Sequence, residues 1–233
     1  TELNKLRGTY FFLTDDGSVS GAGRELVSGV MKGKLFEQKL KDYLSSVEVG
    51  VDKSCGYHIH INTRDFKPKD IKHLFRTYKD LENIFFSLIP ESRKNNRYCL
   101  QFEKIYRHTH EFSGEQTKYA IEKNFYQTYN KRQLNNAKRH KYNSLRYAWA
   151  NFHSIFSHYN VEIRLHSGTT DYKKILHWIA FNTSIVEYVK RYGRLEANGL
   201  RELLFKLVEK DLITEKTFYY YIDRQKELNR RLS

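Results

Sequence analysis

The stretch NVEIRLHSGTTD, residues 160–171, alternates apolar and ionisable side chains with a period of two, which is the pattern of a β-strand. One face of this strand is apolar and the other is ionisable: Val161, Ile163 and Leu165 against Glu162, Arg164 and His166. An ionised side chain on a covered sheet face needs a partner, a metal or a ligand, because removing a charge from water is costly. If the ionisable face lines a cleft, the stretch predicts a functional site.

A second stretch, SCGYHIHINTRD at residues 54–65, has the same pattern. Its two faces are Tyr57, Ile59 and Ile61 against His58, His60 and Asn62. One sheet can display the polar faces of both strands toward the same cleft, so we predict that the two strands share the floor of an active site. His58 and His60 are two residues apart, with Cα atoms about 7 Å apart, close enough for a common site.

These histidines, together with Glu25 and Glu162, supply nitrogen and oxygen donors suited to a divalent metal ion. Mostly carboxylate ligation would favour Mg²⁺ or Mn²⁺ over Zn²⁺. Structural readings stay open at this stage. A lone H-x-H pair is more often exposed or hydrogen-bonded than a metal site, and Glu162 with Arg164 is also compatible with an ordinary charge ladder on a strand.

The chain has 233 residues and a mass of 28.0 kDa, and 39% of its residues are hydrophobic. It can therefore bury the core of one generous domain or two small ones. The two cysteines, Cys55 and Cys99, form no C-x-x-C pair, which favours a reducing cytoplasm. We expect a soluble, cytoplasmic protein, because no apolar run approaches the roughly 20 residues of a membrane span and no leader pattern precedes the domain. The chain starts at Thr1 without an initiator Met, which leaves open that an upstream segment was removed.

The net charge is +14. More than half of this excess of positive charge lies between Glu91 and Arg146, which contain 13 Lys and Arg and 5 Asp and Glu, a difference of +8. Aromatic residues are interleaved with these cations. Such a segment suits nucleic acid, nucleotide phosphates or another acidic polymer, and it is equally compatible with a plain solvated face.

The hydrophobic periodicity predicts the remaining elements. Residues 8–19 and 21–29 form a hairpin with Asp16-Gly17 in its turn, and helices are expected at 35–47, 67–90, 115–129, 171–193, 199–210 and 214–231. No repeat and no low-complexity linker interrupts the chain, which favours one continuous domain. Paired strands with helices over one face predict an α+β fold.

Four motifs in this order carry a family resemblance: DDGSVSGAGRELVS, CGYHIHIN, PESRKNNRYC and VEIRLHSGTTDYKKILHWI. The succession resembles the amidoligase family, ATP-dependent carboxylate-amine ligases distantly similar to glutamine synthetase and glutamate-cysteine ligase. The resemblance runs from about residue 9 to about residue 190. The most specific part of the resemblance is the E-x-R strand followed by H-x-G-T and by a helix that contains a Trp-Ile pair. The second most specific part is the glycine before the histidine strand.

The resemblance implies a curved antiparallel sheet of the glutamine-synthetase type, with helices on one face and a helical C-terminus. Residues 1–195 would form the catalytic domain and 196–233 its helical extension. Divalent ions, Mg²⁺ or Mn²⁺, and ATP would bind on the concave face. The resemblance implies that Glu25, His58 and Glu162 are metal ligands, with His60 as a neighbour on the same face. It implies that Arg164 stabilises the transferring phosphoryl group. Arg93 and Arg97 would bind phosphates or the acid substrate. Asp16 is a further candidate.

The implied reaction moves the γ-phosphoryl group of ATP onto a carboxylate, and an amine then attacks the acyl phosphate. It needs charge neutralisation rather than a nucleophilic side chain, in keeping with a sequence that shows no Ser-His-Asp or Cys-His signature. The carboxylate and amine partners are small molecules or peptides, and an oligomer is compatible with the fold group.

The opening residues depart from the family pattern, which begins with a G-x-E-x-E strand of metal ligands. Here Glu2 is the only acidic residue before Asp15. Either the opening strand was lost, or another segment supplies it, or the fold was kept while metals and activity were lost. The rival functions are a catalytically silent nucleic-acid-binding or assembly protein, in a virus for example, and a metal-dependent hydrolase or phosphotransferase.

Overall fold

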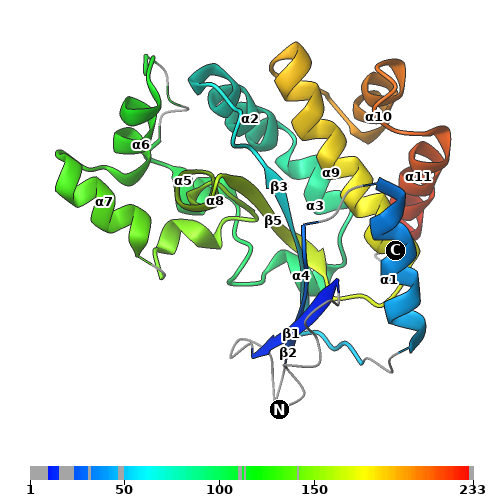
Figure 1. The fold of residues 1–233 in the computed structure, drawn as a ribbon. Coiled ribbons are helices and arrows are strands. Elements are labelled where there is room, and N and C mark those ends of the chain that lie inside the picture. Colours follow the sequence, from blue (N-terminus) through cyan, green and yellow to red (C-terminus); the bar gives the residue numbers. More distant parts are fainter. Residues whose placement is uncertain are drawn as a thin grey trace. The chain divides into compact units, whose positions relative to one another are not determined.

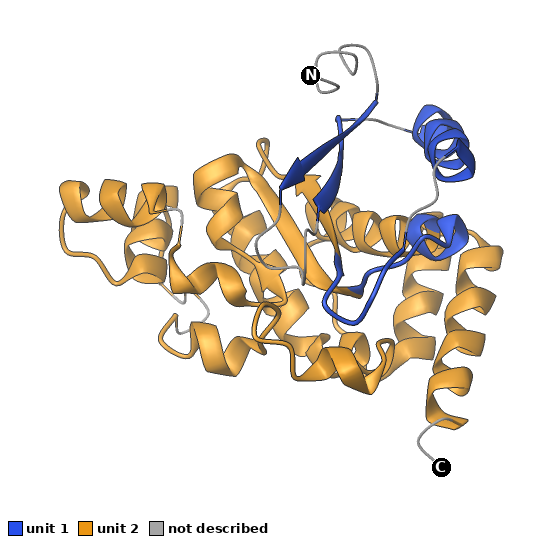
Figure 2. Ribbon diagram, turned by 90° about the horizontal axis from the view of Figure 1, so that it is seen from below, with its two compact units in different colours: residues 1–56, 167–176 blue, residues 57–166, 177–233 orange. Residues whose placement is uncertain are grey.

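The computed structural model describes residues 10–15, 24–30, 33–46, 50–109, 112, 114–140 and 142–230. The chain divides into two compact units, drawn in two colours in Figure 2. Unit 1 comprises residues 1–56 and 167–176, and unit 2 comprises residues 57–166 and 177–233. The predicted division at residue 195 stays a prediction.

Unit 1 contains the predicted hairpin and the first predicted helix. Strands β1 (Phe11–Asp15) and β2 (Arg24–Ser28) pair antiparallel, with Phe11 opposite Ser28. Helix α1 (Gly33–Ser46) follows, and its Phe36 and Tyr43 rings pack on Phe11 at centroid distances of 6.4 and 5.0 Å. Both predictions are confirmed, whereas the turn with Asp16 lies outside the described residues.

The sheet of unit 2 joins strands that are far apart in the sequence. Its order is β3 (Gly56–Asn62), β5 (Asn160–Ser167) and β4 (Ala150–Asn151). Strand β4 runs antiparallel to β5 and places Asn151 opposite Glu162. The predicted neighbourhood of the two polar-faced strands is therefore confirmed, and Figure 1 shows them side by side.

The predicted single helix at 67–90 is wrong, because the chain turns at Leu81. Helix α2 (Pro68–Asp80) begins with proline at its first position and ends at Asp80, and α3 (Glu82–Ser87) begins two residues later. Leu81 has a ψ of −1° and is fully buried. The turn directs the Glu82 carboxylate to the backbone N–H of Phe102 and the indole N–H of Trp149, at 2.8 and 2.7 Å. Apolar spacing does not reveal such a turn.

The basic middle of the chain folds into short helices. They are α4 (Glu91–Lys94), α5 (Phe102–Tyr106), α6 (Lys118–Tyr126), α7 (Lys131–Arg139), the 3-10 helix η3 (Ser144–Tyr147) and α8 (His153–His158). The helix expected at 115–129 is α6, capped by Thr117 and ended by Gln127 in the left-handed region. Helix α7 was not predicted. It is capped by Asn130, whose Oδ1 accepts from the Gln133 N–H at 3.0 Å.

The C-terminal helices match their predictions: α9 (Tyr172–Tyr192), α10 (Leu200–Glu209) and α11 (Glu215–Arg230). Their apolar residues join the strands in one buried core, to which Trp149, Trp178 and Leu203 belong. Across the described part of the chain, no helix combines the length and apolar character needed to cross a bilayer. The α+β class is confirmed. The described strands form two small antiparallel sheets, so one curved sheet of the glutamine-synthetase type stays a prediction.

Candidate active site

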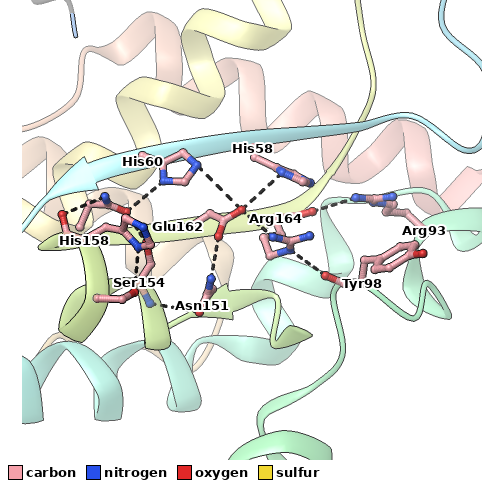
Figure 3. A network of polar contacts seen from close by, with 11 residues as sticks. His58, His60, Arg93, Tyr98, Asn151, Ser154, His158, Glu162 and Arg164 are labelled. Carbon is pink, nitrogen blue, oxygen red and sulfur yellow. Dashed lines mark hydrogen bonds and ion pairs between the residues drawn. The ribbon is translucent and has the colours of Figure 1, made fainter. Parts of the chain in front are cut away.

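The Glu162 carboxylate is the centre of a polar network on the β3–β5 face, shown in Figure 3. Its Oε1 accepts a hydrogen bond from Arg164 Nη1 at 2.6 Å, and its Oε2 accepts one from Asn151 Nδ2, also at 2.6 Å. Only 8% of the Glu162 side chain is exposed. Both carboxylate oxygens are therefore held by donors on the protein.

Two histidines of β3 approach the same carboxylate oxygen. His58 Nδ1 lies 3.4 Å and His60 Nε2 3.9 Å from Glu162 Oε1. The prediction that the two strands bring these side chains together is confirmed in geometry, although their roles remain predictions. Because 54% of the His60 side chain is exposed but only 23% of the His58 side chain, the network meets solvent mainly at His60.

Asn160 fixes which nitrogen of His60 faces Glu162. The Asn160 amide nitrogen donates to the His158 carbonyl at 3.3 Å, and its Oδ1 accepts from the Ser154 hydroxyl at 2.7 Å. The same Oδ1 lies 3.0 Å from His60 Nδ1, so Nδ1 must carry the proton, because an amide oxygen only accepts. Nε2 is then the ring nitrogen that lies toward Glu162.

The protonation states follow from burial and neighbouring charge. Burial raises the pKa of Glu162, but the positive charge of Arg164 outweighs it and holds the pKa below its ordinary value. Burial, with the positive charge of Arg164, lowers the pKa of His58 to about 3. At neutral pH the network therefore contains an ionised carboxylate and an uncharged His58 imidazole.

Two of the predicted arginines lie against the backbone near this network. Arg164 Nε donates to the Tyr98 carbonyl at 2.9 Å, in addition to the bond with Glu162. The buried Arg93 donates through Nη2 to the Arg164 carbonyl at 2.9 Å and through Nε to the Leu165 carbonyl at 3.3 Å. Arg93 thus braces the end of β5. Arg97 is exposed and donates to the Tyr98 hydroxyl at 2.7 Å. Phosphate binding by Arg93 or Arg97 stays a prediction.

The remaining candidates from the sequence are Glu25, Asp16 and His166. Glu25 is an exposed residue of β2, opposite Thr14 in the hairpin of unit 1, and its metal role stays a prediction. Asp16 is outside the described residues. His166 continues the alternation along β5. It is buried, with its ring 5.0 Å from that of Trp178 and 5.9 Å from that of Tyr57.

The donor set fits a metal ion that other ligands complete. Within the residues that the structure describes, no group of three or more His, Cys, Asp and Glu side chains forms a metal site. Glu162 Oε1 and His60 Nε2 lie 3.9 Å apart, and a carboxylate oxygen and an imidazole nitrogen are both donor types that a divalent ion accepts. Mg²⁺ commonly takes only one or two protein ligands and completes its shell with phosphates and water, whereas imidazole also suits Mn²⁺.

A comparison with protein families matches residues 14–186, well over half of the chain, to the family described as "Putative amidoligase enzyme". The chain belongs to this amidoligase family. The match covers the strands and loops that carry the Glu162 network. A search of curated proteins and a search of solved structures each found no match.

One motif of the family resemblance has a direct structural reason. In the H-x-G-T stretch, the Gly168 N–H donates to the Cys55 carbonyl at 2.9 Å, where the chain enters the G-x-H-x-H strand. A Cβ atom on Gly168 would lie 2.5 Å from Cys55 Cβ and 3.2 Å from the Cys55 carbonyl. The glycine is therefore required by the close approach of two backbones.

Proposed function

We propose that this chain is an ATP- and Mg²⁺-dependent ligase that joins a carboxylate to an amine through an acyl phosphate. The observation that carries the proposal is the convergence of Glu162, Arg164, His58 and His60 on one face of two neighbouring strands, in a chain of the amidoligase family. Phosphoryl transfer is catalysed chiefly by positioning and charge neutralisation, and these side chains supply both.

In the first step, an oxygen of the substrate carboxylate attacks the γ-phosphorus of ATP, and the bond between that phosphorus and the bridging oxygen of ADP breaks. Negative charge spreads over the transferring phosphoryl group. The hydrogen bonds from Arg164 to Glu162 and to Tyr98 use two of the five N–H donors of the guanidinium. The remaining donors can face the phosphoryl group, with the guanidinium already held in place.

Glu162 and His60 would hold the divalent ion, with His58 beside them. There it would supply positive charge that offsets the negative charge of the phosphates. The uncharged state of His58 keeps additional positive charge away from this position. The hydrogen bond at His60 Nδ1 leaves Nε2 as the nitrogen that would face the ion.

In the second step, the amine nitrogen attacks the acyl carbon, the C–N bond forms, inorganic phosphate leaves with the electron pair of the C–O bond, and the nitrogen loses a proton. No side chain forms a covalent intermediate. A metal-dependent hydrolase or phosphotransferase could use the same residues, but it would consume ATP without an amine. Membership in the amidoligase family supports an enzyme over a silent binding protein.

Hydroxylamine tests the proposal, because it captures an acyl phosphate as a hydroxamate. The protein is incubated with ATP, Mg²⁺ or Mn²⁺, hydroxylamine and pooled amino acids and peptides, and both ADP and hydroxamate are measured. We expect hydroxamate in proportion to ADP, and a loss of roughly 10²- to 10³-fold in Arg164→Lys, as for other donors to transition-state charge. The exposed control Arg201→Lys should keep full activity. ADP release without acyl product, or undiminished by Arg164→Lys, would refute the proposal.

A further inference from the structure

Helix α7 forms a basic face at the end of unit 2 that is far from α10 and α11 in both Figure 1 and Figure 2. We call it the α7 surface and define it by exposed residues: Tyr129, Lys131, Arg132, Asn135, Asn136, Arg139 and Tyr142. The Glu162 network does not include any of these residues.

Helical geometry places the polar residues of the α7 surface on one side. At about 100° per residue, Lys131, Asn135, Arg139, Arg132 and Asn136 fall within about 140° of the helix circumference. Leu134, which is 2% exposed, and Ala137 lie on the opposite side, packed against the core. The helix is therefore anchored by its apolar side, and its cations project into solvent along about 12 Å of axis.

The positive charge of this region is not offset locally. Residues 118–146 contain eight Lys and Arg but one acidic residue, Glu122. Glu122 is buried and already paired with Lys138 at 2.9 Å. Among the residues that the structure describes, no carboxylate forms an ion pair with Lys131, Arg132 or Arg139. The three cations therefore attract an external polyanion.

Two tyrosine rings flank the helix. Tyr129 is 86% exposed just before the helix and Tyr142 is 67% exposed just after it. Large exposed rings at both ends of a cationic helix match the arrangement in which bases stack on aromatic side chains while Lys and Arg follow the phosphates. An acidic polypeptide would use the cations but has no need of the rings.

We propose that the α7 surface binds single-stranded nucleic acid, with phosphates on Lys131, Arg132 and Arg139 and bases stacked on Tyr129 and Tyr142. The exposed amides of Asn135 and Asn136 lie between the cations and can hydrogen-bond to bases or sugars. This binding is separate from the proposed ligase activity and requires none of its residues.

The first test titrates the full chain into fluorescein-labelled oligo-dT and oligo-U of about 20 nucleotides, long enough to span such a site. Binding is measured by anisotropy between about 50 and 200 mM salt. Three neutralised phosphates predict a slope of roughly −2 in log K against log salt. The variant Lys131→Ala, Arg132→Ala, Arg139→Ala should lose that slope and bind at least about tenfold more weakly at low salt. Its matched control, Arg201→Ala, Lys216→Ala, Lys226→Ala, removes three exposed cations from α10 and α11 and should bind as the unaltered chain does.

The second test separates stacking from charge. Tyr129→Ala with Tyr142→Ala should weaken oligonucleotide binding by roughly 5- to 150-fold per stacked base without changing the salt slope. The control Tyr192→Ala with Tyr219→Ala removes rings that are 50% and 61% exposed on α9 and α11 and should have no effect. Melting temperatures of all variants show that each is folded. The proposal is overturned by an oligonucleotide that fails to bind, by binding that the tyrosine pair does not affect, or by polyglutamate that binds as tightly as the oligonucleotide.

Discussion

Arg164 Nη1 lies 2.6 Å from Glu162 Oε1, and both side chains project from the same face of β5 in a buried position, 7% and 8% exposed. Their spacing of two residues makes the pairing a direct consequence of strand geometry. Burial makes the pair interdependent, because either charge alone would be left in a site with little water.

Arg164→Met should lower the free energy of unfolding by about 3–5 kcal/mol, since it leaves the Glu162 carboxylate buried without its guanidinium partner. The double variant Glu162→Leu, Arg164→Met removes both charges and should recover a large part of that loss. Urea unfolding of the two single variants and the double variant measures the coupling. Losses that simply add would show that the two charges do not depend on each other.

Stability should fall as the pH drops from about 6.5 toward 3, because His58 has a folded pKa of about 3 and an unfolded pKa of about 6.5. In that window the unfolded chain takes up a proton that the folded chain does not. The contribution of one such group is about 1.4 kcal/mol per pH unit. The pKa of Glu162 is lower in the folded than in the unfolded chain, where it is about 4.3. The stabilising effect of Glu162 is therefore lost only below about pH 4.3, as the pH falls through the folded pKa.

Urea unfolding at several pH values between about 5 and 6.5 therefore isolates the histidine effect. His58→Asn should reduce the slope of stability against pH by an amount close to that of one proton. His153, whose burial lowers its pKa to about 4, adds a slope of the same sign and is present in both proteins. An unchanged slope in His58→Asn would mean that His58 is protonated in the fold.

Asn160→Ala should weaken the metal-dependent part of nucleotide binding about 10- to 100-fold, because it releases the Nδ1–H of His60 from its acceptor. Asn160→Asp keeps an oxygen acceptor and should retain most of the affinity. Nitrogen NMR shifts of His60 report the tautomer directly, independently of activity. If His60 carries its proton on Nε2 in the unaltered protein, the positioning role of Asn160 is wrong.

Gly168→Ala should destabilise the protein by about 1–3 kcal/mol, since the new Cβ would meet Cys55 Cβ at 2.5 Å. Cys55→Gly removes that Cβ, so the double variant should be more stable than Gly168→Ala alone. Comparison of their melting temperatures decides the point. No recovery in the double variant would place the strain at the Cys55 carbonyl, 3.2 Å away, instead.

The sequence predicted those parts of the fold whose signal is local and periodic. Alternation located β3 and β5, and helical spacing located α9, α10 and α11. It could not show the turn at Leu81, because the apolar spacing continues through a single residue with a changed ψ. It also missed α7, in which only Leu134 and Ala137 are apolar. Asn130 followed by Gln133, a capping pattern, was the signal available there.

The site was predictable to the extent that one strand face carries it. Glu162, Arg164, His58 and His60 follow from alternation, and Asn160 could have been found by extending the same face by one position. Asn151 belongs to a strand of two residues and Ser154 to α8, so only tertiary pairing brings them to Glu162 and Asn160. Alternation also did not reveal that the His166 ring packs against Trp178.

Thermal unfolding with and without ATP and Mg²⁺ or Mn²⁺ tests the central claim that the Glu162 network binds a metal-nucleotide complex. At about 100 times the dissociation constant the ligand adds roughly 2.7 kcal/mol, which raises the midpoint of a chain of this size by roughly 5 to 10 °C. We predict this rise only when metal and ATP are both present, its loss in Glu162→Gln, and its retention in Glu122→Gln, a matched change in the buried pair with Lys138. A metal-dependent rise that survives in Glu162→Gln, or the absence of any rise in the unaltered protein, would contradict the account.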